Sequence, residues 1–204
     1  MDENSKLKAL NRKEKISSDK SLAFYEQVIN LHKELDDAFI SQFNRSLPFS
    51  ETLFDRWDRA KKLGFGNNSS IYDSALVFGE AKVGANVWIG PNTIIDGSGG
   101  LSIGDFCTIS VGVHIYTHDN VKQTLTSGKH PIERAPVQIG DNVYIAPNAI
   151  ITKGVSIGNF SIIGAHAFVN KDVPDNAIVM GQPAKVVGVV TFENDEPRFN
   201  YYEK

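Results

Sequence analysis

The sequence contains few of the residues that disulfide frameworks and membrane spans require. One cysteine, Cys107, occurs among 204 residues, so an internal disulfide and any CxxC metal or redox motif are excluded. No apolar run approaches the roughly 18 residues that a membrane-spanning helix needs. The net charge of −3 gives no reason to expect nucleic acid or an anionic membrane as a partner. Residues 1–20 lack the apolar core of a secretory signal, so we expect a cytoplasmic protein.

A six-residue period runs through residues 71–174. A branched apolar residue opens each hexad, and a small or β-branched residue such as Ala75, Val87 or Val113 follows four positions later. The opening residues are Ile71, Val77, Val83, Ile89, Ile95, Ile103, Ile109, Ile115, Ile139, Ile145, Ile151, Ile157, Ile163 and Val169. An amphipathic helix would show a period of 3.6 and a half-buried strand a period of 2, so neither fits.

A period of six fits a chain that bends at each hexad and stacks triangular coils on one another. Hexapeptide repeats of this kind indicate a parallel β-helix, in which each coil buries its core against its neighbours. The predicted fold is therefore mainly β. Cys107 occupies one of the small companion positions, so we interpret it as a packing residue and not as a nucleophile.

Two interruptions break the period. The hexad from Ile95 to Ile103 is two residues too long, and the extra residues fall within Asp96-Gly97-Ser98-Gly99-Gly100. The period then lapses over residues 116–138, which are polar and contain two of the five histidines. A regular scaffold with one long excursion is typical of a rigid support that carries a functional loop.

The sequence predicts three parts: an N-terminal helical extension over residues 1–66, a β-helix over 67–188 with its loop at 116–138, and a tail over 189–204. Apolar residues at three- and four-residue steps predict one helix over residues 21–45 and a second over 51–62. We expect these helices to cap the open first coil, and the alternative is packing against a neighbouring subunit.

Three motifs make the chain resemble a known family. They are Tyr116-Thr117-His118-Asp119 in the excursion, Ile139-Gly140-Asp141-Asn142-Val143-Tyr144-Ile145 at the restart and Gly181-Gln182-Pro183-Ala184-Lys185 at the exit. Residues 71–190 resemble the left-handed parallel β-helix acyltransferases, and most of all the sugar O-acetyltransferases that act on maltose, galactosides and surface polysaccharides. The resemblance implies a left-handed coil and a homotrimer. It also implies acetyl-CoA along each cleft between subunits and an excursion that reaches over the neighbour.

Acyl transfer from a thioester to a hydroxyl needs a base, donors for the oxyanion, and two substrates held together. His118 is our candidate base, because a histidine near its ordinary pKa is largely neutral at cytosolic pH and can accept a proton. It lies where the periodic shaft gives way to the excursion, and the resemblance implies the same role. The alternative for His118 is a surface histidine in a turn.

Three carboxylates are candidates for orienting His118 or for binding hydroxyls of the acceptor: Asp96, Asp119 and Glu133. A carboxylate on the second ring nitrogen of a histidine fixes its tautomer and stabilises the imidazolium. Asp96 begins the two-residue insertion one coil earlier, so it is expected near the same cleft. Each of the three has the alternative of a solvated acid in a turn.

The resemblance also implies a set of residues around the acyl donor. The Ala165 N–H matches an oxyanion donor, and Ala146 is the substitute for Pro147, which has no N–H to give. Tyr144 stands where many members have a tryptophan beside the thioester. The residues that match contacts to the pantetheine or phosphates of CoA are Asn170, Lys171 and Lys185.

Three alternatives to a sugar O-acetyltransferase remain open. An N-acetyltransferase acting on a nucleotide-linked amino sugar would share the scaffold and differ in the acceptor. A zinc hydratase on the same fold would use three histidines, for which His114, His118 and His130 are candidates, but their spacing does not place ligands on successive coils. A non-catalytic scaffold would use none of these residues. We expect acyl transfer without a metal.

Overall fold

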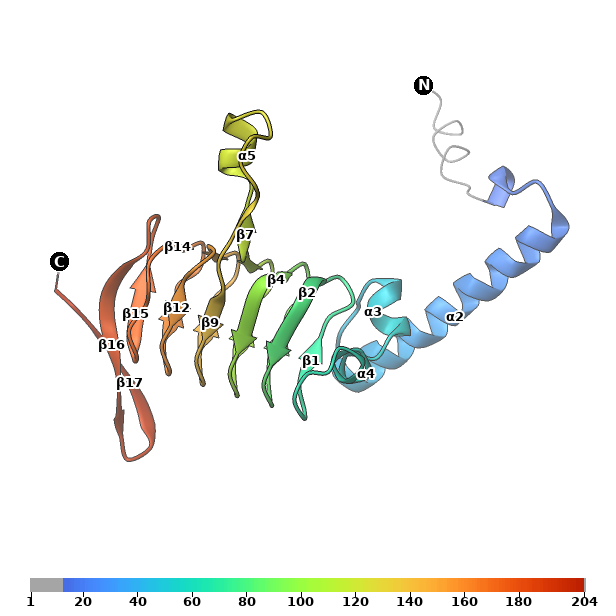
Figure 1. The fold of residues 1–204 in the computed structure, drawn as a ribbon. Coiled ribbons are helices and arrows are strands. Elements are labelled where there is room, and N and C mark those ends of the chain that lie inside the picture. Colours follow the sequence, from blue (N-terminus) through green and yellow to red (C-terminus); the bar gives the residue numbers. More distant parts are fainter. Residues whose placement is uncertain (1–12, 204) are drawn as a thin grey trace, which may run out of the picture. The chain divides into compact units, whose positions relative to one another are not determined.

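The computed structural model describes residues 13–203, and the chain divides into two compact units, residues 1–53 and residues 54–204. Helices are few and the remaining elements are short strands (Figure 1). The helical segments are η1 (Lys13–Lys15), α2 (Asp19–Phe43), α3 (Phe49–Leu53), α4 (Arg56–Lys62) and α5 (Val121–Leu125). The strands are β1 (Ser70–Ile71), β2 (Leu76–Val83), β3 (Trp88–Ile89), β4 (Ile94–Ile103), β5 (Thr108–Ile109), β6 (His114–Ile115), β7 (His118–Asp119), β8 (Glu133–Arg134), β9 (Val137–Ile139), β10 (Tyr144–Ile145), β11 (Ile150–Ile151), β12 (Ser156–Ile157), β13 (Ile162–Ile163), β14 (Phe168–Val169), β15 (Ala177–Met180), β16 (Lys185–Glu193) and β17 (Glu196–Tyr201).

The first unit is built on α2, which confirms the helix predicted over residues 21–45. Ser18 caps its start by accepting a hydrogen bond from the Ser21 N–H, and Asn44 ends it in the left-handed conformation, at φ 51°. None of the described residues of α2 is fully buried, and Phe49 of α3 packs edge-on against His32, so within the described residues the apolar stripe on α2 is covered only in part.

The single helix predicted over residues 51–62 is wrong. Two short helices, α3 and α4, occupy this segment, because Asp55 interrupts the pattern as the N-cap of α4 and accepts from the N–H groups of Trp57 and Asp58. A local side-chain cap thus outweighs a continuous apolar pattern. In the second unit, α4 covers the first coil: Ala60 is buried in its core, and Arg59 donates to the carbonyls of Tyr72 and Ala75.

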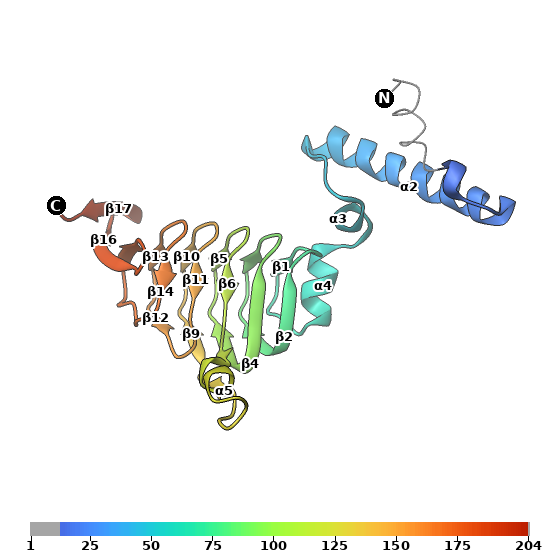
Figure 2. The ribbon, with the colours of Figure 1, turned by 90° about the horizontal axis from the view of Figure 1, so that it is seen from above.

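The second unit is a β-solenoid, as the hexad period predicts. Its first face is a parallel stack of β1, β3, β5, β10, β13 and β15, and successive strands mark six coils. Figures 1 and 2 show the coils stacked side by side along the shaft. A second face stacks β6, β11 and β14 on the first halves of β2 and β4, and a third stacks β9 and β12 on their second halves. Because β2 and β4 run through the corner, both faces form one continuous sheet.

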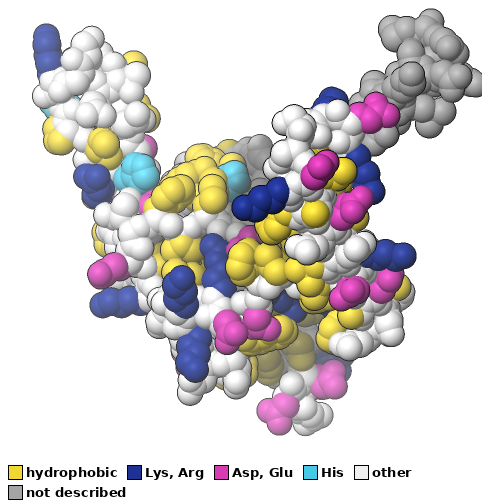
Figure 3. All heavy atoms as spheres, turned by 90° about the vertical axis from the view of Figure 1, so that its right-hand side faces the viewer, with side chains coloured by type: hydrophobic (Ala, Val, Ile, Leu, Met, Phe, Trp, Pro, Cys, Tyr) yellow, Lys and Arg dark blue, Asp and Glu magenta, His cyan; other side chains and the backbone are white. Residues whose placement is uncertain are grey.

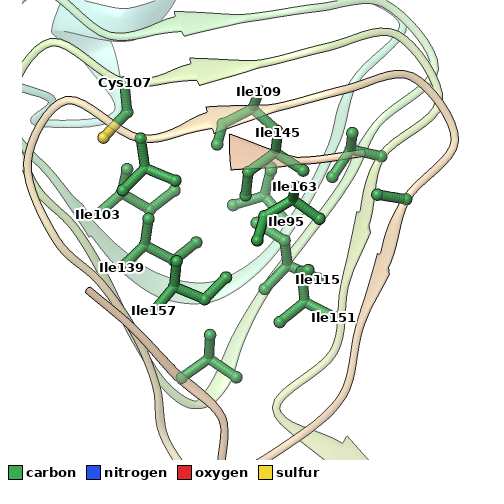
Figure 4. Packing of buried hydrophobic residues seen from close by; sticks show 14 of the residues in the cluster. Ile95, Ile103, Cys107, Ile109, Ile115, Ile139, Ile145, Ile151, Ile157 and Ile163 are labelled. Atoms are coloured by element: carbon green, nitrogen blue, oxygen red, sulfur yellow. The ribbon is translucent and has the colours of Figure 1, made fainter. Parts of the chain in front are cut away.

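The core of the solenoid is the column of hexad-opening residues. Ile71, Ile89, Ile95, Ile109 and Ile115 are fully buried, and the columns of isoleucines converge inside the triangular cross-section (Figure 4). The small companions pack beside them, Cys107 among them at 1% exposed. Burial raises the pKa of the Cys107 thiol to about 11, which confirms its interpretation as an inert packing residue.

The excursion leaves the corner between the second and third faces. It rises through β7, turns through α5 and returns through β8, which pairs antiparallel with β7 (Figure 1). The shaft resumes at Val137, which is fully buried and pairs with Leu101 of β4. The tip projects from the solenoid, at the upper left of Figure 3, and carries the exposed side chains of Val121 and Leu125.

The C-terminal segment is a β-hairpin. β16 pairs antiparallel with β15, the last strand of the first face, and β17 pairs antiparallel with β16. The hairpin therefore extends that face beyond the last coil. In the part of the chain that the structure describes, no helix has the length and apolar character needed to cross a membrane.

Candidate active site

Two of the predicted site residues meet at the corner where the excursion begins. The register of β4 with β6 places Ile95 beside Ile115, so the residues that follow this pair in the two chain segments lie next to each other. There the Oδ2 atom of Asp96 lies 2.6 Å from Nδ1 of His118. The Asp96 side chain is 1% exposed and that of His118 is 39% exposed. A buried carboxylate thus contacts one nitrogen of an imidazole that reaches the surface.

The Asp96 carboxylate is surrounded by hydrogen-bond donors. Its Oδ1 accepts from the Ser98 N–H at 3.0 Å and the Ser98 hydroxyl at 2.6 Å, and its Oδ2 accepts from the Thr117 N–H at 2.8 Å and the Thr117 hydroxyl at 3.0 Å. Burial opposes ionisation of Asp96, but the hydrogen bonds from Ser98, Thr117 and His118 outweigh it and hold the pKa well below its ordinary range. Asp96 is therefore a fixed anion.

An ionised carboxylate has no proton to donate, so Nδ1 of His118 must carry the hydrogen in this contact. The neutral imidazole then has its lone pair on Nε2, the nitrogen that Asp96 does not engage. This is the tautomer in which a histidine accepts a proton at Nε2, and Asp96 can stabilise the imidazolium that results. The pair has the arrangement of a general base with an orienting carboxylate.

Asp119 and Glu133 lie in the excursion, on β7 and β8, where they are paired across the two strands. Lys153, from the next coil, contacts both: its Nζ lies 2.8 Å from Asp119 Oδ2 and 3.3 Å from Glu133 Oε2. Lys122 contacts the second oxygen of Glu133 at 2.5 Å. Hydrogen bonds from Lys153 to Asp119 and from Lys122 to Glu133 lower the pKa values of both carboxyl groups. These contacts tie the base of the excursion to the shaft.

The residues matched to the acyl donor lie at several places. Asn170 and Lys171 follow β14 at the corner that carries His118, and both are exposed. Ala146 and Ala165 follow β10 and β13 at a different corner, between the first and second faces. Within one chain the structure therefore does not bring these two alanines to the His118 corner.

The other residues matched to the acyl donor differ in their exposure and in whether their N–H groups are free to bind an oxyanion. Tyr144 is 45% exposed on the first face, and Lys185 is exposed at the start of β16. The N–H of Ala146 already donates to the Ile163 carbonyl at 2.8 Å, so it is not available as an oxyanion donor in this chain. Ala165 is exposed at its turn.

Three residues of this corner were missed in the sequence analysis: Ser98, Thr117 and Lys153. Ser98 and Thr117 hydrogen-bond Asp96, and Lys153 holds the excursion. The two-residue insertion was the available signal for Ser98, because an irregularity next to the excursion marks the same corner. Within residues 13–203, no group of three or more His, Cys, Asp or Glu side chains is arranged to hold a metal ion.

The comparisons with known proteins agree with this fold. Residues 136–171 match the model "Bacterial transferase hexapeptide (six repeats)", and residues 80–117 match "Hexapeptide repeat of succinyl-transferase". The chain is 29% identical over 145 residues to galactoside O-acetyltransferase of Escherichia coli K12, which covers 60% of this chain and 69% of that protein.

Two further proteins are similar to this chain. It is 30% identical over 124 residues to the putative colanic acid biosynthesis acetyltransferase WcaF of Escherichia coli K12, which covers 52% of this chain and 68% of that protein. A crystal structure of a maltose O-acetyltransferase from Clostridium difficile 630 superposes with a TM-score of 0.53 at 28% identity, covering 79% of this chain and 87% of that one.

Both matched models describe hexapeptide repeats of transferases, and the similar proteins are acetyltransferases. The chain belongs to the hexapeptide-repeat acetyltransferase family, and it is an acetyltransferase of class EC 2.3.1.

Proposed function

We propose that this protein transfers the acetyl group of acetyl-CoA to a hydroxyl of a sugar or of a surface-glycan precursor. His118 is the general base. The observation that carries the proposal is the Asp96–His118 contact of 2.6 Å, because it assigns the hydrogen to Nδ1 and leaves Nε2 as the proton acceptor. The similarity to galactoside and maltose O-acetyltransferases supports a sugar as the acceptor.

The reaction is a direct transfer. Nε2 of His118 takes the hydroxyl proton as the acceptor oxygen bonds to the thioester carbonyl carbon, and a tetrahedral oxyanion forms. When the intermediate collapses, the carbon–sulfur bond breaks, and the CoA thiolate leaves and receives the proton from the imidazolium. Asp96 stays ionised throughout, because its donors hold its pKa low, and so it stabilises the imidazolium without taking the proton.

The proposed oxyanion donor is the backbone N–H of Ala165, and the proposed contacts to CoA come from Asn170, Lys171 and Lys185. Ala146 lines the cleft without donating its N–H, and Tyr144 flanks the thioester. We place Asp119 and Glu133 at the edge of the acceptor site, where Lys153 holds them.

The active form we propose is a homotrimer. In one chain the corner with His118 is not the corner with Ala165, so a complete site needs the second corner from another copy. The excursion supports this arrangement, since its tip presents Val121 at 55% and Leu125 at 79% exposure, with no cover in a single molecule. Covering those side chains with a neighbour would remove exposed apolar surface.

The experiment that tests the function measures thiol release from acetyl-CoA with a panel of acceptors. We expect turnover with sugars such as maltose or a galactoside, and mass spectrometry of the product should show one added acetyl group that mild base removes, as an ester requires. An acetyl group that resists mild base would indicate an amide and would replace our proposal with N-acetylation of an amino sugar. No thiol release above the rate without enzyme, with any acceptor, would contradict the proposed donor.

A further inference from the structure

Ser98 has two contacts that bear on the orientation of His118. Its Oγ atom lies 2.6 Å from Asp96 Oδ1 and 3.1 Å from His118 Nδ1. Because the ionised carboxylate accepts, the Ser98 hydroxyl donates its hydrogen to Oδ1. Its lone pairs then remain for the hydrogen on Nδ1. The Nδ1–H group of His118 therefore faces two acceptors, the Asp96 carboxylate and the Ser98 hydroxyl.

The backbone holds Ser98 in this place through the glycines on both sides of it. A Cβ atom on Gly97 would lie 2.4 Å from the Glu80 carbonyl oxygen, and one on Gly99 would lie 2.3 Å from the Thr117 carbonyl oxygen. Both approaches are too close for any side chain, so the insertion packs its backbone directly against β2 and against the start of the excursion. The Gly99 N–H also donates to the Thr117 hydroxyl at 2.8 Å. The position of the Ser98 side chain is thus set by close backbone contacts, although the residue itself is exposed.

We propose that Ser98 is a positioning residue for His118, whose hydroxyl holds the Nδ1–H tautomer and the ring orientation that leave Nε2 free for the acceptor's proton. This inference rests on the proposed role of His118 as the base. Asp96 alone fixes one contact of the ring, and rotation about that contact would still move Nε2. A second acceptor for the same hydrogen limits that rotation. The other tautomer would present the Nδ1 lone pair to those of Asp96 Oδ2, and the Ser98 oxygen, whose hydrogen is donated to Oδ1, adds further lone pairs that oppose it.

Three variants test the role of Ser98 by steady-state kinetics. Ser98→Ala removes the hydroxyl, Ser98→Thr keeps it at an exposed position, and Ser102→Ala is a matched control on the same strand, β4. With maltose, or with water as acceptor if maltose is inert, we expect Ser98→Ala to lower kcat about tenfold, the loss of one hydrogen bond, with KM for acetyl-CoA unchanged. Ser98→Thr should restore most of the rate. Ser98→Cys, which keeps the side-chain volume, gives the same comparison if Ser98→Ala does not fold.

A second measurement does not depend on turnover. Long-range ¹H–¹⁵N spectra of the ring should show a single Nδ1–H tautomer for His118 in the wild type and a mixture in Ser98→Ala. The inference would be overturned if the Ser98→Ala variant kept the wild-type kcat and showed a single tautomer. It would also be overturned if Ser98→Ala lost rate and Ser98→Thr did not restore it. A wild-type protein that transfers no acetyl group would instead refute the proposed function, while the tautomer spectra would still test Ser98.

Discussion

Nδ1 of His118 lies 2.6 Å from Oδ2 of Asp96, although 22 positions separate the two residues in the chain. That separation is one coil of the solenoid with its two-residue insertion, plus the first residues of the excursion. The coil stack thus brings the carboxylate under the imidazole, and the contact is formed by the backbone scaffold before any substrate binds. Preorganisation of this kind lets a base act without reorganising in the transition state.

The first prediction concerns the base itself. His118→Ala removes the proton acceptor, so kcat for acetyl transfer should fall roughly 10²- to 10⁴-fold, while the dissociation constant for CoA, measured by calorimetry, should change little. His130→Ala is the matched control, because His130 is an exposed histidine of the same excursion. Equal turnover in the His118→Ala variant and the wild type would exclude His118 from the mechanism.

The second prediction concerns the pH dependence of stability. Asp96→Asn places an amide where five donors converge, so it should lower the free energy of unfolding at neutral pH by about 1–3 kcal/mol. The folded-state pKa of Asp96 lies below its ordinary value of 3.8. Its stabilising contribution is therefore complete above that ordinary value and is lost as the pH falls toward the folded-state pKa.

Thermal unfolding of the wild type and of Asp96→Asn between pH 8 and pH 3 measures the predicted pH dependence of the stabilisation by Asp96. The difference in Tm should stay constant from pH 8 to about pH 5 and should narrow progressively below about pH 4. Ser102→Ala serves as the control and should run parallel to the wild type at every pH. A difference that widens as the pH falls would mean that the native state prefers the protonated acid.

The sequence predicts the solenoid well, because every hexad follows the same local packing pattern: a branched residue points into the core and a small residue packs at the corner. Ile71, Ile109 and Ile163 are fully buried as that pattern requires. The prediction failed where a single side chain competed with a pattern, as when Asp55 divided the helix expected over residues 51–62. The hairpin of β16 and β17 carries no hexad signal, because its two consecutive strands pair antiparallel with each other and do not form another parallel coil.

The site was harder to predict than the core, because it depends on register. Asp96, Asp119 and Glu133 were all candidates in the sequence, with Asp96 favoured by its place in the insertion, and in the structure Asp96 alone of the three contacts His118. The choice follows from the pairing of β4 with β6, and the sequence does not specify which coil positions become neighbours across an excursion. Thr117 had no signal of its own, since threonine is common in turns, and the only signal for Ser98 was the two-residue insertion that contains it.

The third prediction concerns the anchor of the excursion. Lys153→Met removes the cation that contacts both Asp119 and Glu133, so β7 and β8 should separate from the shaft more often. Limited trypsin digestion should cut after Lys129 about three- to fivefold faster than in the wild type, and high salt should reduce the difference because it screens the pairs. Lys82→Met, an exposed lysine of β2, is the control. A cleavage rate equal to that of the wild type would show that the excursion keeps its place without Lys153.

The fourth prediction concerns the oligomer. A trimer of the 22.4 kDa chain should sediment at roughly 67 kDa in analytical ultracentrifugation. Leu125→Asp places a charge on the most exposed apolar side chain of the excursion tip, 79% exposed in one molecule. Because a buried leucine contributes about 1.5–3 kcal/mol, its loss from an interface should raise the concentration at which the trimer dissociates at least tenfold. Lys129→Asp introduces the same carboxylate on the same tip without removing apolar surface, so it should leave the sedimentation unchanged. If Leu125→Asp instead sediments as the wild type does at every concentration, the tip lies outside the subunit interface, and the second corner of the site must reach His118 by another contact.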